Sequence, residues 1–341
     1  MFVPGTAAAP ATSPWLSVLL PVYDVESYLL PCARSLLDQD LRGVELLFLD
    51  DASPDGSGEL LQALAAEYPG VVRVSRSATN RSVGATRNAL LDAARGEWLW
   101  FVDPDDLVEP GAVGSLRRIV DRYRPDLVMC DFRAFIDGGG PPDPGDEHVA
   151  SFRGPSGVLS RDRDALLRGL FRAGKMHVWT KVFRRDVWPP GLRFVSGRAF
   201  QDLALVARLS MEVRTWFHTE QIWMAYRQRP GSIQATLNLA KLDHWMEALE
   251  GYAAELLRWE VEVGPRTHAA IADYCARSLM RVGELTDRLA GPGCELRHLR
   301  NGARWRSACA WSAERLERSY WLRGRLGRAM RWRRWRRRFG L

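Results

Sequence analysis

The segment from Trp98 to Asp106 constrains the fold of this chain more than any other. Residues 98–102 are all apolar, a run too short for a helix of its own, which predicts a strand buried on both faces of a sheet. Three aspartates follow within four residues, and Pro104 among them ends the strand. Such a cluster repels itself unless a cation lies within it, and hard divalent cations that keep water and phosphate ligands suit it. The alternative is an acidic loop with Asp106 as the N-cap of a helix.

Short strand-like and helix-like segments alternate through the first part of the chain. Pro31 is expected in the first turn of the first helix and Ser57 as the N-cap of the second. Alternation at this spacing requires right-handed crossovers, so the predicted fold class is α/β, with a Rossmann-like, doubly wound and mostly parallel sheet. We expect strands over residues 16–20, 44–49, 71–74, 98–102 and 126–130, and helices over residues 26–39, 58–68 and 83–94.

The pattern changes at residues 137–157, which are rich in Pro, Gly and Asp and predict a loop or hairpin beside the site. After this segment we expect one helix before and one helix after a strand-like stretch at 179–187. A helical C-terminal region is expected to follow them. We expect these helices over residues 161–171, 200–211 and 239–289, continuing to about 321. The predicted division is a disordered leader (1–14), a catalytic domain (15–236), a helical region (237–321) and a basic tail (322–341).

The cysteines and the apolar runs exclude several classes of protein. Five cysteines are scattered without a CxxC pair, which argues against a disulfide framework or a zinc site and favours a reducing compartment. Residues 1–14 lack the basic and apolar regions of a signal peptide. No run approaches the roughly 18 apolar residues of a transmembrane helix, so we expect a cytoplasmic protein.

The positive charge of the chain is concentrated in its tail. Residues 322–341 hold nine arginines and no acids; without them the chain has 39 basic side chains against 41 acidic ones, a net charge of −2. Arginine interleaved with tryptophan favours a peripheral contact with an anionic membrane surface. The alternatives are nucleic-acid binding, which nothing else in the chain supports, a disordered solvated tail, or a helix packed on the body. On a helix, Leu322, Leu326 and Met330 share one face, and Trp332, Trp335 and Phe339 share another.

The second predicted strand also ends in paired carboxylates, Asp50 and Asp51. An open parallel sheet brings the ends of its strands to one edge, where Asp51 joins the aspartates at 103, 105 and 106. A ligand for such a negative site should bring cations or hydrogen-bond donors. A nucleoside diphosphate with its divalent ion brings both, because the base offers N–H groups and the ion joins carboxylates to phosphates.

Six motifs follow one another along the chain: Pro21-Val22-Tyr23, the acidic turn at 50–57, Gly84-Ala85-Thr86-Arg87-Asn88, Asp103-Pro104-Asp105-Asp106, the segment at 179–185, and Gln201-Asp202. In this order they resemble the motifs of family 2 glycosyltransferases, which are inverting enzymes of the GT-A fold. The resemblance covers about residues 16–233 and implies metal-dependent transfer of a sugar from a UDP-sugar to a saccharide, lipid-linked or polymer acceptor. It also implies a role in bacterial cell-envelope, exopolysaccharide or teichoic-acid assembly on the inner face of the membrane.

The resemblance assigns each motif residue a role. Positions matching Pro21, Val22 and Tyr23 frame the nucleobase, and Asp51 matches the carboxylate that accepts from its N–H, which favours uracil. Arg87 matches an arginine near the nucleotide, and Asp103 a residue that faces the ribose.

The reacting end of the donor is assigned to the acids that follow. Asp105 and Asp106 match the residues that hold Mg²⁺ or Mn²⁺ on the diphosphate, and Asp202 matches the general base. Contacts with the diphosphate or the acceptor are expected from Lys181, Arg227 and Arg229.

Each role has a plainer alternative. Tyr23 could be a core aromatic side chain, Arg87 could pair with Asp92 or Asp51, and Asp202 could only cap the following helix. Lys181 could belong to a solvated face. The chain also departs from the family at Gln201, where Glu is common, at Pro104 and at Thr86.

Two other functions remain open. A sugar-phosphate nucleotidyltransferase has a similar sheet, but the Gly-rich loop expected after its first strand is replaced here by Pro21-Val22-Tyr23-Asp24. A catalytically silent, membrane-docked nucleotide-binding protein is the alternative from another class. Product release from UDP-sugars separates an enzyme from a protein that binds nucleotide without turnover.

Overall fold

The computed structural model describes residues 13–138, 146–230, 236–291 and 293–341. The chain forms two compact units. The first comprises residues up to 161 together with 177–197 and 212–230, and the second comprises 162–176, 198–211 and the chain from 231 onward. The second unit therefore takes two segments from within the predicted catalytic domain.

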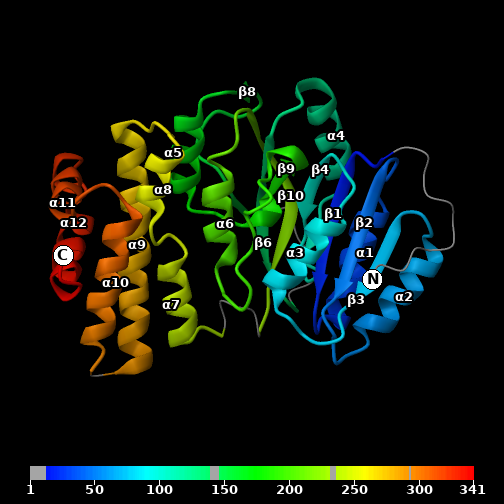
Figure 1. The fold of residues 1–341 in the computed structure, drawn as a ribbon, viewed down its shortest axis with the longest axis horizontal. Coiled ribbons are helices and arrows are strands. Elements are labelled where there is room, and N and C mark those ends of the chain that lie inside the picture. Colours follow the sequence, from blue (N-terminus) through cyan, green and yellow to red (C-terminus); the bar gives the residue numbers. More distant parts are fainter. Residues whose placement is uncertain (1–12, 139–145, 231–235, 292) are drawn as a thin grey trace. The chain divides into compact units, whose positions relative to one another are not determined.

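The first unit is built on a ten-stranded sheet (Figure 1). Eight of its strands have the order β3-β2-β1-β4-β9-β6-β10-β5, and beside them β7 pairs with β6 and β8 with β10. The pairs β1–β2, β2–β3, β1–β4 and β6–β10 are parallel, while β9 runs antiparallel between β4 and β6. The predicted α/β class with a mostly parallel sheet is confirmed. The strands are β1 Leu16–Val22, β2 Val44–Asp50, β3 Val72–Arg76, β4 Trp98–Phe101, β5 Leu107–Val108, β6 Leu127–Ile136, β7 Glu147–Val149, β8 Leu159–Ser160, β9 Lys181–Arg184 and β10 Trp216–Gln228.

Every residue of β1, β2 and β4 is buried, as expected of central strands covered on both faces. The short β7 pairs antiparallel with β6, so part of the predicted loop or hairpin at 137–157 is a hairpin strand; residues 139–145 lie outside the described part. The helices of this unit are α1 Glu26–Leu37, α2 Ser57–Glu67, α3 Val83–Ala93 and α4 Ala112–Tyr123.

Two local expectations at the first helices are wrong. Pro31 lies inside α1 beyond its first turn, and the helix tolerates it because Pro31 and Ser27, whose carbonyl loses its partner, are both exposed to water. Ser57 is the first residue of α2 instead of its cap, and its hydroxyl accepts from the Val25 N–H at 3.3 Å.

Strand β10 was not expected from the sequence. Its register shifts between Thr219 and Ile222 and again before Met224, so the polar residues at the irregularity interrupt the alternation that marks a strand. This strand carries Arg227 at its end, which matters for the site below.

The second unit is helical. Its core includes the fully buried side chains of Tyr252, Trp305 and Trp332. Within the described residues, no helix is both long enough and apolar enough to cross a membrane. The helices are α5 Arg163–Ala173, α6 Gln201–Leu209, α7 Leu239–Glu247, α8 Tyr252–Arg258, α9 Pro265–Ala290, α10 Glu295–Ala308, α11 Ala313–Leu322 and α12 Leu326–Arg338.

The basic tail forms helix α12, which packs against α9, α10 and α11. Trp332, Trp335 and Phe339 are buried, and the Trp332 indole N–H donates to the Ala313 carbonyl at 3.0 Å. The alternative of a disordered tail is therefore wrong for residues 326–338, because this apolar face completes the helical core.

Candidate active site

Three aspartates follow β4 at the edge of the sheet. Asp106 is 1% exposed and directly precedes β5, so the alternative that it caps a helix is wrong. Its Oδ1 accepts from the Arg227 N–H at 2.9 Å. Its Oδ2 is buried and has no hydrogen-bond partner among the described residues. A buried carboxylate oxygen without a partner is costly unless a ligand satisfies it.

Arginines from distant segments hold the other two carboxylates. Arg229 Nε donates to Asp105 Oδ2 at 2.7 Å, and Arg227 Nε donates to the Asp105 carbonyl at 2.9 Å. Arg87 Nη2 donates to Asp103 Oδ1 at 2.7 Å. Arg87 therefore pairs with an aspartate of the cluster, and Asp92 pairs with Arg193.

Burial and mutual repulsion dominate the electrostatics of this cluster. Burial, with the neighbouring charges of Asp105 and Asp103, raises the pKa of Asp106 well above its ordinary value. Burial and Asp103 likewise raise the pKa of Asp105, against the effect of Arg229. Burial, and to a smaller extent the charges of the three aspartates, raise the pKa of Tyr226 to about 12. A divalent cation would favour the charged carboxylates and relieve this repulsion.

The donor set fits a hard cation. Asp105 and Asp106 offer carboxylate oxygen atoms, one of which is the buried Oδ2 of Asp106 that has no partner within the described segments. Mg²⁺ and Mn²⁺ prefer carboxylate, water and phosphate oxygens. These two residues could therefore hold such an ion beside a diphosphate.

The neighbouring strand ends present an acceptor and an aromatic ring. Strand β1 lies between β2 and β4 in parallel register, so Tyr23, Asp51 and Asp103 follow strands that end at one edge. Asp51 Oδ2 accepts from the Arg81 N–H at 2.9 Å, and its buried Oδ1 has no partner in the described part of the chain. Tyr23 is 46% exposed, so the alternative of a core aromatic side chain is wrong. Pro21 and Val22 are buried within β1 and supply backbone at this edge.

Tyr28 and Asp137 join this network and were not predicted. The Tyr28 hydroxyl donates to Asp137 Oδ2 at 2.9 Å, and Arg227 Nη1 donates to Asp137 Oδ1 at 3.0 Å. The guanidinium groups of Arg227 and Arg229 lie over the Tyr28 ring, at 5.1 and 5.0 Å from its centroid. A tyrosine on a helix and an aspartate at the start of a loop carry no sequence signal that would reveal this contact.

Lys181 is fully buried in β9. Its Nζ donates to Thr180 Oγ1 at 2.7 Å and to the His177 carbonyl at 3.1 Å. The alternative that it belongs to a solvated face is wrong, and its predicted contact with diphosphate or acceptor stays a prediction.

Asp202 lies on α6, in the second unit. The N-cap of α6 is Phe200, which has φ +58° and stacks on Trp245 with ring centroids 4.8 Å apart. The alternative that Asp202 is the cap is therefore wrong. Asp202 is half-buried in the first helical turn, next to the buried Gln201. Its role as general base stays a prediction.

Comparison with known proteins identifies the fold and its family. The family described as "Glycosyl transferase family 2" matches residues 17–183. This chain contains a family 2 glycosyltransferase domain. The match includes the turn after β2 and the acidic cluster, and ends in β9, so it spans the ends of β1, β2 and β4.

Curated relatives of this family 2 domain come from bacteria. "Glycosyltransferase GlyA" of Streptococcus pneumoniae is 23% identical over 283 residues, which are 81% of this chain and 38% of GlyA. "Minor teichoic acid biosynthesis protein GgaB" of Bacillus subtilis is 32% identical over 125 residues, 36% of this chain and 14% of GgaB. The chain spans less than half the length of GlyA and of "Putative glycosyltransferase EpsH" of B. subtilis, of which it covers 48%.

Solved structures show the same GT-A fold. S. aureus TarS in complex with UDP-GlcNAc matches with a TM-score of 0.56 at 18% identity, over 86% of this chain and 88% of that one. The mannosyltransferase PcManGT of Pyrobaculum calidifontis, in complex with GDP-Man and Mn²⁺, matches with a TM-score of 0.54 at 16% identity. The match covers 99% of this chain and 88% of that one.

Proposed function

We propose that this protein transfers a sugar from a UDP-sugar to a hydroxyl of a saccharide, lipid-linked or polymer acceptor. The observation that carries the proposal is the buried Oδ2 of Asp106, without a partner among the described residues, in an acidic cluster at the ligand-binding edge of a family 2 domain. The cluster favours a ligand that arrives with a cation, as a nucleoside diphosphate does.

The nucleoside would bind at the ends of β1 and β2. The half-exposed Tyr23 ring offers a surface for the base, and the unpartnered Oδ1 of Asp51 offers an acceptor for a base N–H. The ribose would face Asp103, whose Oδ1 is held by Arg87. Uracil presents one ring N–H, which suits a single carboxylate oxygen.

The diphosphate would bind beside Asp105 and Asp106, which would hold Mg²⁺ or Mn²⁺. When bound, this ion supplies positive charge that offsets the charge of the departing diphosphate. Arg229, which pairs with Asp105, and Arg227, which holds Asp106 through its N–H, position the two carboxylates. Tyr28 and Asp137 in turn orient Arg227, so they are positioning residues.

The transfer is proposed as a single displacement. Asp202 accepts the proton of the acceptor hydroxyl, and the hydroxyl oxygen forms a bond to the anomeric carbon. The bond between that carbon and the diphosphate oxygen breaks on the opposite face, and UDP leaves with the electron pair. The anomeric configuration inverts because there is one displacement.

The acceptor is proposed to be a component of the bacterial cell envelope. GgaB is described as a minor teichoic acid biosynthesis protein. A relative from Bacillus spizizenii, 30% identical over 129 residues, is described as poly(ribitol-phosphate) beta-glucosyltransferase. Both names favour polysaccharide or teichoic-acid assembly.

Nucleotide release tests the proposal. The purified full chain is incubated with a panel of UDP-sugars and envelope acceptors, with and without Mn²⁺, and UDP is measured. Asp202→Asn should lose transfer but keep the rise in melting temperature that UDP with Mn²⁺ produces. Glu59→Gln, which also removes an acid from a first helical turn, is the control and should keep both properties.

The other outcomes separate the alternatives. Binding of UDP without turnover of any donor would favour a silent nucleotide-binding protein. Loss of UDP binding in Asp202→Asn would assign this residue a structural role. If UDP raises the melting temperature equally without metal, Asp105 and Asp106 are not metal ligands.

We also propose a peripheral contact of α11 and α12 with the inner face of the membrane. Four apolar side chains near the turn between these helices are exposed: Trp321, Leu322, Leu326 and Met330. Exposed arginines, among them Arg323, Arg334 and Arg337, accompany them. Apolar side chains bordered by cations suit the headgroup layer of anionic lipids. The predicted contact therefore moves from Trp332 and Trp335, which are buried, to the opposite face of the tail.

Vesicle flotation tests this contact with the full chain. Phosphatidylglycerol vesicles should retain the protein at moderate salt, and phosphatidylcholine vesicles should not. The variant Leu322→Ser/Leu326→Ser should lose binding, while Leu257→Ser, at another exposed leucine of the second unit, should keep it. If phosphatidylglycerol vesicles retain both variants equally, the proposed membrane contact is wrong.

A further inference from the structure

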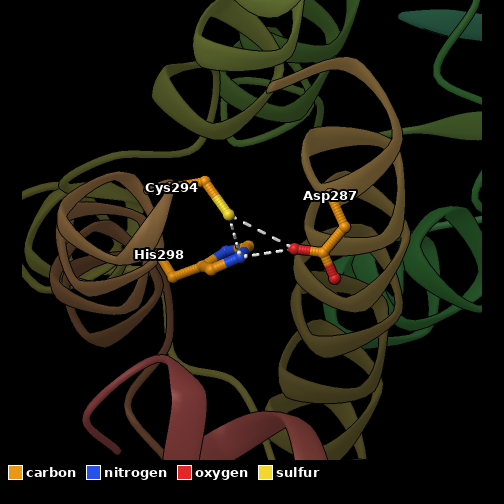
Figure 2. A group of neighbouring side chains, drawn as sticks. All are labelled: Asp287, Cys294 and His298. Carbon is orange, nitrogen blue, oxygen red and sulfur yellow. Dashed lines mark hydrogen bonds and ion pairs between the residues drawn. The ribbon is translucent and has the colours of Figure 1, made fainter. Parts of the chain in front are cut away.

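Three side chains of the second unit converge at one end of α9 and α10. Asp287 lies on α9, Cys294 precedes α10, and His298 lies one turn into α10 (Figure 2). The Sγ of Cys294 lies 3.3 Å from His298 Nε2 and 3.4 Å from Asp287 Oδ1, and Nε2 and Oδ1 are 2.9 Å apart. A sulfur, a nitrogen and an oxygen thus face one point.

We propose that Asp287, Cys294 and His298 bind a zinc ion. Zinc is held tetrahedrally by these three kinds of side chain, at bond lengths that place ligand atoms about 3.4–3.6 Å apart. The three observed separations differ from this by about half an ångström or less. A thiolate and an imidazole together favour zinc over Mg²⁺, which prefers oxygen.

One nitrogen of His298 faces several polar groups. His298 Nε2 faces Cys294 Sγ, Asp287 Oδ1 and, at 3.3 Å, Arg338 Nη2. If Nε2 carries a proton it can donate to Asp287 but cannot accept from Arg338 or Cys294; without the proton it faces a carboxylate oxygen at close range. With the proton on Nε2, Asp287 Oδ1 accepts from His298, Cys294 and Arg338 at once, and a cation between the three ligand atoms would take the place of these donors.

Arg338 is the group that competes with the metal. Its Nη1 and Nη2 donate to the two carboxylate oxygens of Asp287 at 2.7 and 2.8 Å. Its side chain is 40% exposed near the end of α12, so it can turn into solvent and leave its place to a water molecule as the fourth zinc ligand. The guanidinium is thus a cation already placed where the cluster attracts one.

The role of the ion would be structural. It would join the end of α9 to the start of α10, which pack side by side, across the short connection that contains Gly291 and Gly293. This site differs from the proposed Mg²⁺ or Mn²⁺ site in unit and in ligand chemistry, and it does not depend on the proposed function. The scattered cysteines had argued against zinc, but Cys294 and His298 are four residues apart at the start of one helix, a spacing that places two ligands on one face.

Cobalt substitution tests the proposal. The full chain is stripped with a chelator and titrated with Co²⁺, whose visible bands and thiolate charge-transfer band report a tetrahedral cysteine site. One equivalent of Co²⁺ should produce both, and one equivalent of Zn²⁺ should displace it and raise the melting temperature. Cys294→Ser should weaken binding about 100-fold or more, beyond the loss seen when only a supporting residue of a metal site is removed. Cys309→Ser, which changes another buried thiol of the same unit, should bind like the parent.

Arg338→Ala separates a metal site from a polar network. It removes the competing cation, so it should bind Co²⁺ more tightly than the parent, although the ion pair with Asp287 is lost. If neither the parent nor Arg338→Ala shows the charge-transfer band, or if Cys294→Ser keeps it, the proposal is overturned. The parent and Arg338→Ala both keep all three ligands. Their spectra therefore test the proposal even if Cys294→Ser fails to fold.

Discussion

The acidic cluster at residues 103–106 and the arginine run at 322–341 are both runs of like charge, and the fold treats them differently. In the tail, arginines reach acids on other helices, as Arg336 does with Glu314 at 2.6 Å and Arg331 with Glu284. In the cluster, arginines hold Asp103 and Asp105, but among the described residues Asp106 receives only a backbone N–H, on one of its oxygens. Charge that the protein satisfies supports structure, and charge that it leaves unsatisfied in a buried place points to a ligand.

The largest effect is expected for the buried face of the tail. Trp332→Ala removes a fully buried indole that packs on Trp305 with ring centroids 5.2 Å apart, and should lower the free energy of unfolding by about 3–5 kcal/mol. Met330→Ala, at an exposed position of the same helix, should change it by less than about 0.5 kcal/mol. Urea unfolding followed by circular dichroism measures both; equal losses would contradict the two-faced description of α12.

The next effect concerns activity instead of stability. Asp106→Asn keeps the acceptor for the Arg227 N–H but removes a charge, and should lower kcat/KM by about 10²–10³-fold. The melting temperature should stay or rise, because burial and two neighbouring acids raise the pKa of Asp106 and make its charged form costly. Asp121→Asn, on the surface of α4, is the control. A large loss of stability in Asp106→Asn would mean that this charge supports the fold.

Asp131 sharpens the comparison, because it is as buried as Asp106 but is satisfied. Burial alone would raise its pKa, yet hydrogen bonds with His218, Ser151 and His148 bring the pKa below its ordinary value. These partners lie at 2.9–3.0 Å. Asp131→Asn should therefore lower the free energy of unfolding by about 1–3 kcal/mol at neutral pH, as measured by urea unfolding.

The sign of the pH dependence follows from the same shift. A carboxyl whose pKa is lower in the folded state contributes stability above its unfolded pKa of about 3.9 and loses it as the pH falls through its folded pKa. The difference between the parent and Asp131→Asn should thus be full near pH 7 and shrink below about pH 4. A difference that grows on acidification would show that Asp131 is not held ionised by its partners.

The smallest effect is expected for a pair at the surface of the tail. Arg331→Ala breaks the contact with Glu284, in which the arginine side chain is half exposed, and should cost less than about 1 kcal/mol. Added salt should reduce even this difference. A cost as large as that of Trp332→Ala would mean that ion pairs, and not the buried aromatic face, hold the tail.

Local pattern determined much of the fold. The apolar runs at 16–20, 44–49 and 98–102 predicted three central strands, because a short run bounded by turn residues has few other ways to bury its side chains. The carboxylates directly after two of these strands predicted where ligand chemistry gathers, since strand ends of a parallel sheet share an edge. Strand β10 escaped prediction because its bulge breaks the alternation.

Only the tertiary structure decided which charges meet. Arg229 reaches Asp105 from 124 residues away, and Asp131 is bonded by His218 from 87 residues away, so neither pairing leaves a local signal. Sequence showed that α12 has two apolar faces, but not that the face with Trp332 would be the buried one. The physical reason is separation along the sequence. Hydrophobic periodicity can be read within a few neighbouring residues, whereas the partner of a charged side chain depends on the strand order and the helix packing.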